Sequence, residues 1–192
     1  MAYKLIVIGV SAGGFEALSQ LLPMLPARFP IPILIVQHQH KHSDNFLVQY
    51  LNERCALEVV EAIDKMNIQS GKVYIAPPGY HLLVEDLNTL ALSCAPKVNF
   101  SQPSIDVLFE SAADIFKAQL IAVILTGANS DGVAGAKKIK RNGGYVVVQS
   151  LETAEAKMMP SETLKQVQVN KVLDLIHIPQ HLILLAEHME QA

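Results

Sequence analysis

The chain has 192 residues, of which 51% are hydrophobic and 17% are charged, so it can bury a sizeable core, and we expect a single domain over residues 1–192. The formal net charge of −3 argues against nucleic acid or an anionic membrane surface as the main partner. Two cysteines indicate no disulfide framework, and the N-terminal apolar run is too short to span a bilayer, so a cytoplasmic location without membrane insertion is expected.

The first predicted strand leads into a small-residue turn around a serine. Residues 5–8 are apolar without alternation, which is typical of a parallel strand covered on both faces. A helix with apolar residues at helical spacing is expected to follow at 15–22. Between them, Gly9-x-Ser11-x-Gly13 matches a nucleophile elbow, in which a strand-to-helix turn presents a reactive hydroxyl.

A glycine-rich phosphate or dinucleotide cradle is the alternative interpretation of this turn. The dinucleotide fingerprint has glycine where Ser11 stands and an acidic residue after the second strand, where this chain has Gln37 and His38. The turn alone leaves both interpretations open.

Apolar runs alternate with helical patterns along the rest of the chain. Short runs between residues 57 and 93 predict a mixed or antiparallel flank. The remaining alternation predicts a doubly wound α/β fold with a mainly parallel sheet and helices on both faces. Further strands are expected at 33–36, 57–60, 72–75, 81–84, 90–93, 120–125 and 145–148, and helices at 46–52, 105–116, 132–141, 161–167 and 180–190.

Three chemically useful residues follow three of the predicted strands. Ser11 follows the first strand, His38 the second, and Asp131 lies in the loop after 120–125. Because ligands bind at the carboxyl ends of parallel strands, these residues are expected at one edge of the sheet. A histidine can take the serine proton, and a carboxylate can fix its tautomer and stabilise the imidazolium. The sequence therefore predicts a Ser-His-Asp nucleophile.

The chain resembles the catalytic domain of CheB-type chemotaxis protein-glutamate methylesterases. The matching segments occur in the family's order between residues 5 and about 165, and six in register are far more specific than any one. They are 8–14, 36–38, 73–82, 103–109, 125–127 with 131–132, and 159–160.

The resemblance implies hydrolysis of glutamate γ-methyl esters on chemoreceptor helices or another sensor protein, with glutamine deamidation as a second activity and no cofactor. It makes Ser11 the nucleophile, His38 the base and acid, and Asp131 the orienting carboxylate. The backbone N–H groups of Ala128 and Ala12 become oxyanion donors.

The chain departs from the family's pattern at several positions. Ala12, Ala128, Asn129 and Gln102 replace threonine, methionine, glycine and arginine, and Gln102 and Met159 are candidate substrate contacts. No receiver domain is expected before residue 1, so a separate receiver-domain protein is the expected regulator. A signalling scaffold of the same fold is the alternative function.

Other polar residues have simpler interpretations. His38, His40 and His42 form an H-x-H-x-H run, but further ligands at fixed spacing are missing, so no metal site is expected. His81 is either a buried structural histidine or a cleft contact. Asp106 is expected in the first turn of a helix, where a carboxylate complements the helix dipole.

Overall fold

The computed structural model describes residues 3–187, and its centre is a parallel sheet. Within these residues the sheet has seven strands in the order β3-β4-β2-β1-β7-β8-β9, and every neighbouring pair is parallel. The strands are β1 (Leu5–Val10), β2 (Ile33–Gln37), β3 (Glu58–Glu61), β4 (Lys72–Ile75), β7 (Leu120–Ile124), β8 (Tyr145–Gln149) and β9 (Lys171–Leu173).

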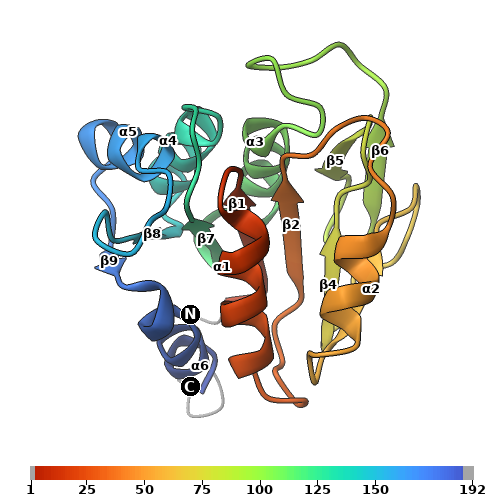
Figure 1. The fold of residues 1–192 in the computed structure, drawn as a ribbon, viewed down its shortest axis with the longest axis horizontal. Helices are drawn as coiled ribbons and strands as arrows, with labels where there is room; N and C mark the ends of the chain where they lie inside the picture. The colour runs from red at the N-terminus through yellow and green to blue at the C-terminus, as the bar shows by residue number, and fades with distance from the viewer. Residues whose placement is uncertain (1–2, 188–192) are drawn as a thin grey trace.

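Helices cover both faces of this sheet, which confirms the predicted doubly wound class (Figure 1). Alternate residues of β1 divide between two cores, with Leu5 and Val7 on the side of α3, α4 and α5, and Ile6 and Ile8 on the side of α1, α2 and α6. The helices are α1 (Gly14–Leu21), α2 (Phe46–Asn52), α3 (Ile105–Phe116), α4 (Val133–Arg141), α5 (Met158–Gln166) and α6 (Ile178–Glu187), and short 3₁₀ turns cover Leu22–Met24, Lys117–Gln119 and Leu175–His177.

The flank between residues 57 and 93 is only partly antiparallel. The hairpin of β5 (His81–Val84) and β6 (Leu90–Ser93) is antiparallel, as expected, and packs its apolar side chains into the core beside α3. The flank is thus mixed, as one of the two expected forms, because β3 and β4 extend the parallel sheet beyond β2. Val59, Val73 and Ile75 are buried in the core on the α1 side, and this burial holds both strands in the sheet.

Other differences from the predicted elements are small. The strand β9 was not predicted because it has three residues, two of them exposed, and therefore carries little hydrophobic signal. Helix α5 begins at Met158, three residues before the expected start. The last three residues of the helix expected at 180–190 lie outside the described residues. No helix within residues 3–187 has the length and apolarity needed to cross a membrane.

The strand order places the loops that follow β1, β2 and β7 next to one another. From β1 the chain moves to β2 on one side and returns later to β7 on the other, so the order reverses at β1. Crevices at such a reversal, outside the carboxyl ends of the strands, are the usual ligand sites of open α/β sheets. The loop between β6 and α3 rises above this same end of the sheet (Figure 1).

Candidate active site

Ser11 lies on the turn between β1 and α1. Gly13 takes a left-handed conformation (φ 76°) immediately before the helix, which a residue with a side chain adopts only with strain. Gly9 permits the start of α3 to approach β1 closely, because a Cβ at Gly9 would lie 2.4 Å from the Ile105 side chain. The Ser11 N–H donates to the Thr126 carbonyl at 3.0 Å. The turn is thus tied to the loop after β7 and lies beside the N-terminus of α3.

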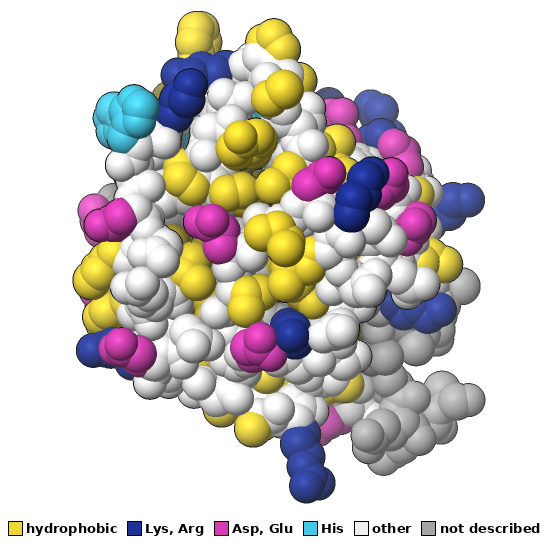
Figure 2. Space-filling view, turned by 90° about the vertical axis from the view of Figure 1, so that its right-hand side faces the viewer, with side chains coloured by type: hydrophobic (Ala, Val, Ile, Leu, Met, Phe, Trp, Pro, Cys, Tyr) yellow, Lys and Arg dark blue, Asp and Glu magenta, His cyan; other side chains and the backbone are white. Residues whose placement is uncertain are grey.

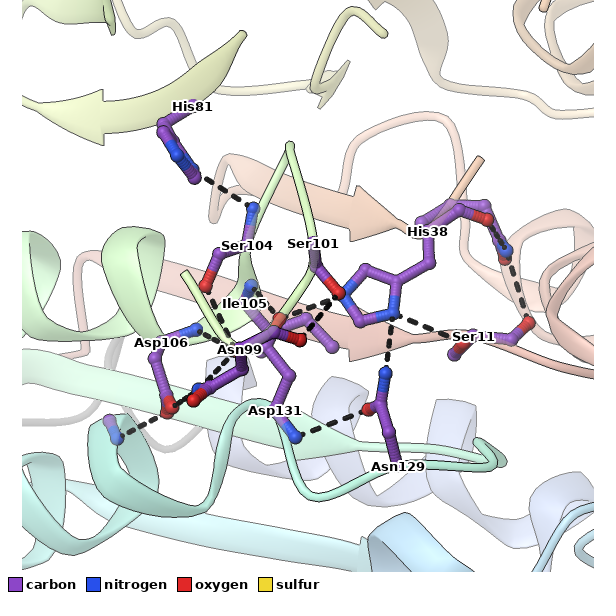
Figure 3. A network of polar contacts seen from close by, with 12 residues as sticks. Ser11, His38, His81, Asn99, Ser101, Ser104, Ile105, Asp106, Asn129 and Asp131 are labelled. Carbon is purple, nitrogen blue, oxygen red and sulfur yellow. Dashed lines mark hydrogen bonds and ion pairs between the residues drawn. The ribbon is translucent and has the colours of Figure 1, made fainter. Parts of the chain in front are cut away.

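His38 follows β2 and lies between Ser11 and Asp131 (Figure 3). Its Nδ1 is 3.1 Å from Ser11 Oγ, and its Nε2 is 2.7 Å from Asp131 Oδ2. The buried Gln37 amide donates to the carbonyls of Ser11, at 3.0 Å, and His38, at 2.8 Å. Gln37 therefore joins the serine turn to the histidine loop.

The hydrogen bonds around His38 define its tautomer. A carboxylate only accepts hydrogen bonds, so the proton of the neutral ring is on Nε2, which donates to Asp131. The Nδ1 atom is then free to accept from the Ser11 hydroxyl. The Asn129 side-chain amide is 3.3 Å from the same Nδ1 and can only donate to it. Asp131 and Asn129 thus favour the tautomer in which Nδ1 is a base, and the Ser11 hydroxyl, which can donate or accept, is compatible with it.

Asp131 is completely buried at the N-terminus of α3. Its carboxylate accepts hydrogen bonds from the backbone N–H groups of Ile105 (2.7 Å) and Asp106 (3.1 Å) and from Ser104 Oγ (2.9 Å). Burial alone would raise the pKa of Asp131, but hydrogen bonds from His38, Ile105 and Asp106 hold this pKa below its ordinary value. Asp131 is therefore a carboxylate at neutral pH, and it also caps α3.

A second buried carboxylate lies next to the first. Asp106 accepts from the Gly135 N–H at 2.7 Å, and the Asn99 amide donates to both Asp106 Oδ2, at 2.7 Å, and Asp131 Oδ1, at 3.3 Å. Burial, with the nearby charge of Asp131, raises the pKa of Asp106 to about 6. Sequence reasoning missed Asn99, because it belongs to a loop without periodicity and lies 32 residues from Asp131.

The surface above these groups forms a cleft of about 470 Å³. Ser11, His38 and Gln102 reach it, and the role of Gln102 as a substrate contact stays a prediction. It is lined by Ser11, His38, Gln39, His40, Lys41, Lys97, Phe100, Ser101, Gln102, Pro103 and Asn129.

The remaining predicted site residues lie elsewhere. Met159, a candidate substrate contact, is instead completely buried, because its side chain packs against Gly127 below the loop after β7. Ala12 and Ala128 are exposed, and neither is among the residues that line the cleft. Within residues 3–187 their backbone N–H groups donate to no backbone acceptor, so both remain available to an added oxyanion.

Within residues 3–187, no metal site is found among the other histidines. His81 is buried, with Nε2 3.1 Å from the Pro96 carbonyl and Nδ1 accepting from the Ser104 N–H at 3.2 Å, so it is a structural histidine. His40 lines the cleft and His42 is exposed. No group of three or more metal-ligating side chains occurs in the described part of the chain.

Comparison with known proteins identifies the fold and the family. The family model for CheB methylesterase matches residues 6–182. The crystal structure of the Thermotoga maritima CheB methylesterase catalytic domain superposes with a TM-score of 0.92 and 37% identity, covering 96% of this chain and 100% of that one.

Two relatives differ in length. A Leptospira interrogans protein, provisionally named a protein-glutamate methylesterase/protein-glutamine glutaminase, is 50% identical over 98% of this chain and 97% of its own length. A Thermotoga maritima protein-glutamate methylesterase/protein-glutamine glutaminase is 38% identical over 94% of this chain, which spans 53% of that relative. The chain thus belongs to the CheB methylesterase family.

Proposed function

We propose that this chain hydrolyses the γ-methyl ester of glutamate side chains in a partner protein, with Ser11 as nucleophile, His38 as base and acid, and Asp131 as orienting carboxylate. The observation that carries the proposal is the continuous hydrogen-bonded line from Ser11 Oγ through His38 to Asp131 at a cleft, in a member of the CheB methylesterase family.

The first half of the reaction forms an acyl-enzyme. His38 Nδ1 accepts the Ser11 proton as Oγ attacks the ester carbonyl carbon, and the carbonyl oxygen becomes an oxyanion. The N–H groups of Ala12 and Ala128 are the proposed donors to this oxyanion. Protonated His38 then gives its proton to the leaving methoxide. Methanol departs and the glutamyl group remains on Ser11.

The second half restores the serine. His38 Nδ1 takes a proton from water, the resulting hydroxide attacks the acyl carbon, and His38 returns the proton to Ser11 Oγ. One ester and one water thus give one glutamate carboxylate, one proton and one methanol. A glutamine side chain entering the same steps would release ammonia. Asp131 supports both halves, because its charge stabilises the imidazolium each time it forms.

We propose signalling sensor proteins, chemoreceptors in particular, as the substrates and the cytoplasm as the site of action. The name of the family model and the names of the relatives support this choice of substrate. A separate receiver-domain protein is the proposed regulator. The exposed position of the cleft suits a substrate that is itself folded.

The experiment is to incubate the purified chain with a sensor protein carrying ¹⁴C-methyl esters on glutamate and to measure released methanol. Ser11→Ala is the test variant, and Ser19→Ala, on the exposed side of α1, is the control. Release by the wild type and the control but not by Ser11→Ala supports the proposal. No release by the wild type, together with stable binding to the sensor, would favour the scaffold function instead.

A further inference from the structure

The rim of the cleft carries an unusual turn that displays an aromatic side chain. Val98 and Ser101 exchange two backbone hydrogen bonds, at 3.1 and 2.9 Å, around Asn99 and Phe100. Both central residues have positive φ, 49° and 63°, a conformation that is uncommon outside glycine and strained for a bulky residue. Phe100 is 97% exposed nevertheless. Local packing of the Phe100 ring therefore does not explain why a phenylalanine occupies this position.

The opposite side of the turn is fixed to the catalytic carboxylate. The Asn99 amide points inward and donates to Asp106 and Asp131, as Figure 3 shows. The Asn99 side chain is hydrogen-bonded to the buried carboxylates beneath the turn. The side chain of the next residue, Phe100, therefore points outward and lines the cleft. The position of Phe100 is thus coupled to the geometry of Asp131, and the turn links the rim of the cleft to the proposed catalytic residues.

The rim is also basic, although the chain has 18 acidic and 15 basic residues. Lys41 and Lys97 line the cleft with His38 and His40, and among the described residues no aspartate or glutamate lines it. Neither lysine forms an ion pair with a described residue. In Figure 2, basic, histidine and hydrophobic side chains lie together at the upper left of the molecule, and the acidic side chains lie lower or toward the right.

We propose that the cleft selects an acidic segment of the substrate protein, whose carboxylates face Lys41 and Lys97 and whose apolar side chain packs on Phe100. This inference rests on the proposed function and adds the chemistry of the sequence around the ester. An aromatic ring presented in advance loses little conformational entropy on binding, and two unpaired lysines attract carboxylates over several ångströms. The Phe100 ring and the two lysines thus favour the same occupant, an acidic segment that carries an apolar side chain.

The test compares two methyl-esterified glutamyl peptides, one with acidic residues flanking an apolar residue and one with serines in place of the acidic residues. We expect the wild type to prefer the acidic peptide in kcat/KM by about tenfold at low salt, and less at 0.5 M salt. The double variant Lys41→Glu/Lys97→Glu should lose or reverse this preference. Phe100→Ser should lower kcat/KM for both peptides about fivefold and keep the charge preference.

A matched double variant separates the cleft from the overall charge. Lys117→Glu/Lys137→Glu makes the same charge change at exposed lysines outside the cleft, and it should keep the wild-type preference. A wild type without preference for the acidic peptide, or a cleft double variant that retains it, would overturn the inference.

Binding distinguishes this inference from the proposed function. Fluorescence anisotropy with the acidic methyl-ester peptide and the Ser11→Ala protein measures affinity without turnover. If the wild type releases no methanol but Lys41→Glu/Lys97→Glu in the Ser11→Ala background weakens peptide binding about tenfold, the proposed function fails and the acidic-segment inference stands. If methanol is released but the lysine substitutions do not change peptide binding, the proposed function stands and the acidic-segment inference fails.

Discussion

The buried groups beneath the cleft, which we call the floor, and the exposed rim of the cleft are built in opposite ways. On the floor, Asp131 is completely buried and its carboxylate accepts hydrogen bonds from five groups, while Asp106 beside it is also buried and hydrogen-bonded. On the rim, Phe100, Lys41 and Lys97 are exposed. A group with many fixed partners has one geometry, whereas an exposed side chain can adapt to its ligand.

This difference separates chemistry from selection. The floor fixes the ring of His38 and the charge behind it, and these requirements are the same for every ester. The rim meets only those parts of a substrate that differ from one protein to another. Changes on the floor should therefore lower kcat for all substrates, and changes on the rim should alter the choice among substrates.

The largest expected effect is at the boundary between floor and rim, at Ser11, the proposed nucleophile. Ser11→Ala should lower kcat by about 10⁶-fold, because loss of a nucleophile in a serine triad removes the covalent route. The thermal unfolding midpoint should stay within a few degrees, since within residues 3–187 the Ser11 hydroxyl bonds only to His38. Methanol release and thermal scans of the variant and of Ser19→Ala measure both. Substantial activity in pure Ser11→Ala would assign the chemistry to another group.

The next effect is on the floor itself. Asp131→Asn should lower kcat by about 10⁴-fold, because an amide can donate to His38 Nε2 and so favours the wrong tautomer. The control Asp114→Asn changes an exposed carboxylate whose partner is Lys138 and should keep full activity. Steady-state kinetics on a small neutral ester measure both variants. A small loss in Asp131→Asn would show that the negative charge is not needed.

A smaller effect is expected at Asn99, which we interpret as a positioning residue. Asn99→Ala removes a donor from two carboxylates, and we expect kcat to fall about tenfold. The pKa of Asp131 should also rise, so the acid limb of the pH–rate profile should move to higher pH. Asn88→Ala, in the turn between β5 and β6, is the control. A change in stability with an unmoved pH profile would reduce Asn99 to a structural role.

The smallest effect is a pH dependence with opposite signs at the two carboxylates. The pKa of Asp131 lies below the unfolded value of about 3.9, so its stabilisation is present above pH 4 and is lost as pH falls further. The pKa of Asp106 is raised to about 6, so its ionisation in the folded state increasingly opposes folding as pH rises from 4 to 6.

Urea unfolding of the wild type and Asp106→Asn between pH 4 and pH 7 measures the Asp106 contribution. The variant should gain free energy of unfolding relative to the wild type as pH rises through this window. Carboxyl ¹³C titration should give a midpoint near 6 for Asp106 and an Asp131 that stays ionised at pH 4. A difference between the two proteins that does not vary with pH would contradict the assignment.

The sequence predicts the parts of this molecule that depend on local patterns. The strand before Ser11 is apolar without alternation and leads into a glycine-rich turn, which indicates a parallel sheet with a chemically useful residue at the carboxyl end of that strand. The same argument applies to His38 and Asp131. Contacts between distant segments were not predictable in this way. The nitrogen of His38 that faces Ser11, the amide of Asn99 and the burial of Met159 all depend on how loops pack against α3 and α5.

The same distinction explains why the sequence left the flank open between mixed and antiparallel. A short strand such as β3 has similar periodicity whether its neighbour is parallel or antiparallel, and the choice is made by burial of Val59 against the core on the α1 side. Gln37 likewise follows an apolar run, as many polar residues at the end of a strand do. Only the structure shows that its amide joins the carbonyls of Ser11 and His38.

Covalent trapping tests the central claim most directly. The purified chain is mixed with an alkyl fluorophosphonate, digested, and analysed by mass spectrometry, with Ser11→Ala and Asp131→Asn in parallel. We expect an adduct on Ser11 in the wild type, a much slower one in Asp131→Asn, and none at that position in Ser11→Ala. An unmodified Ser11 in a preparation that still releases methanol, or an adduct on a different residue that abolishes release, would contradict the central claim.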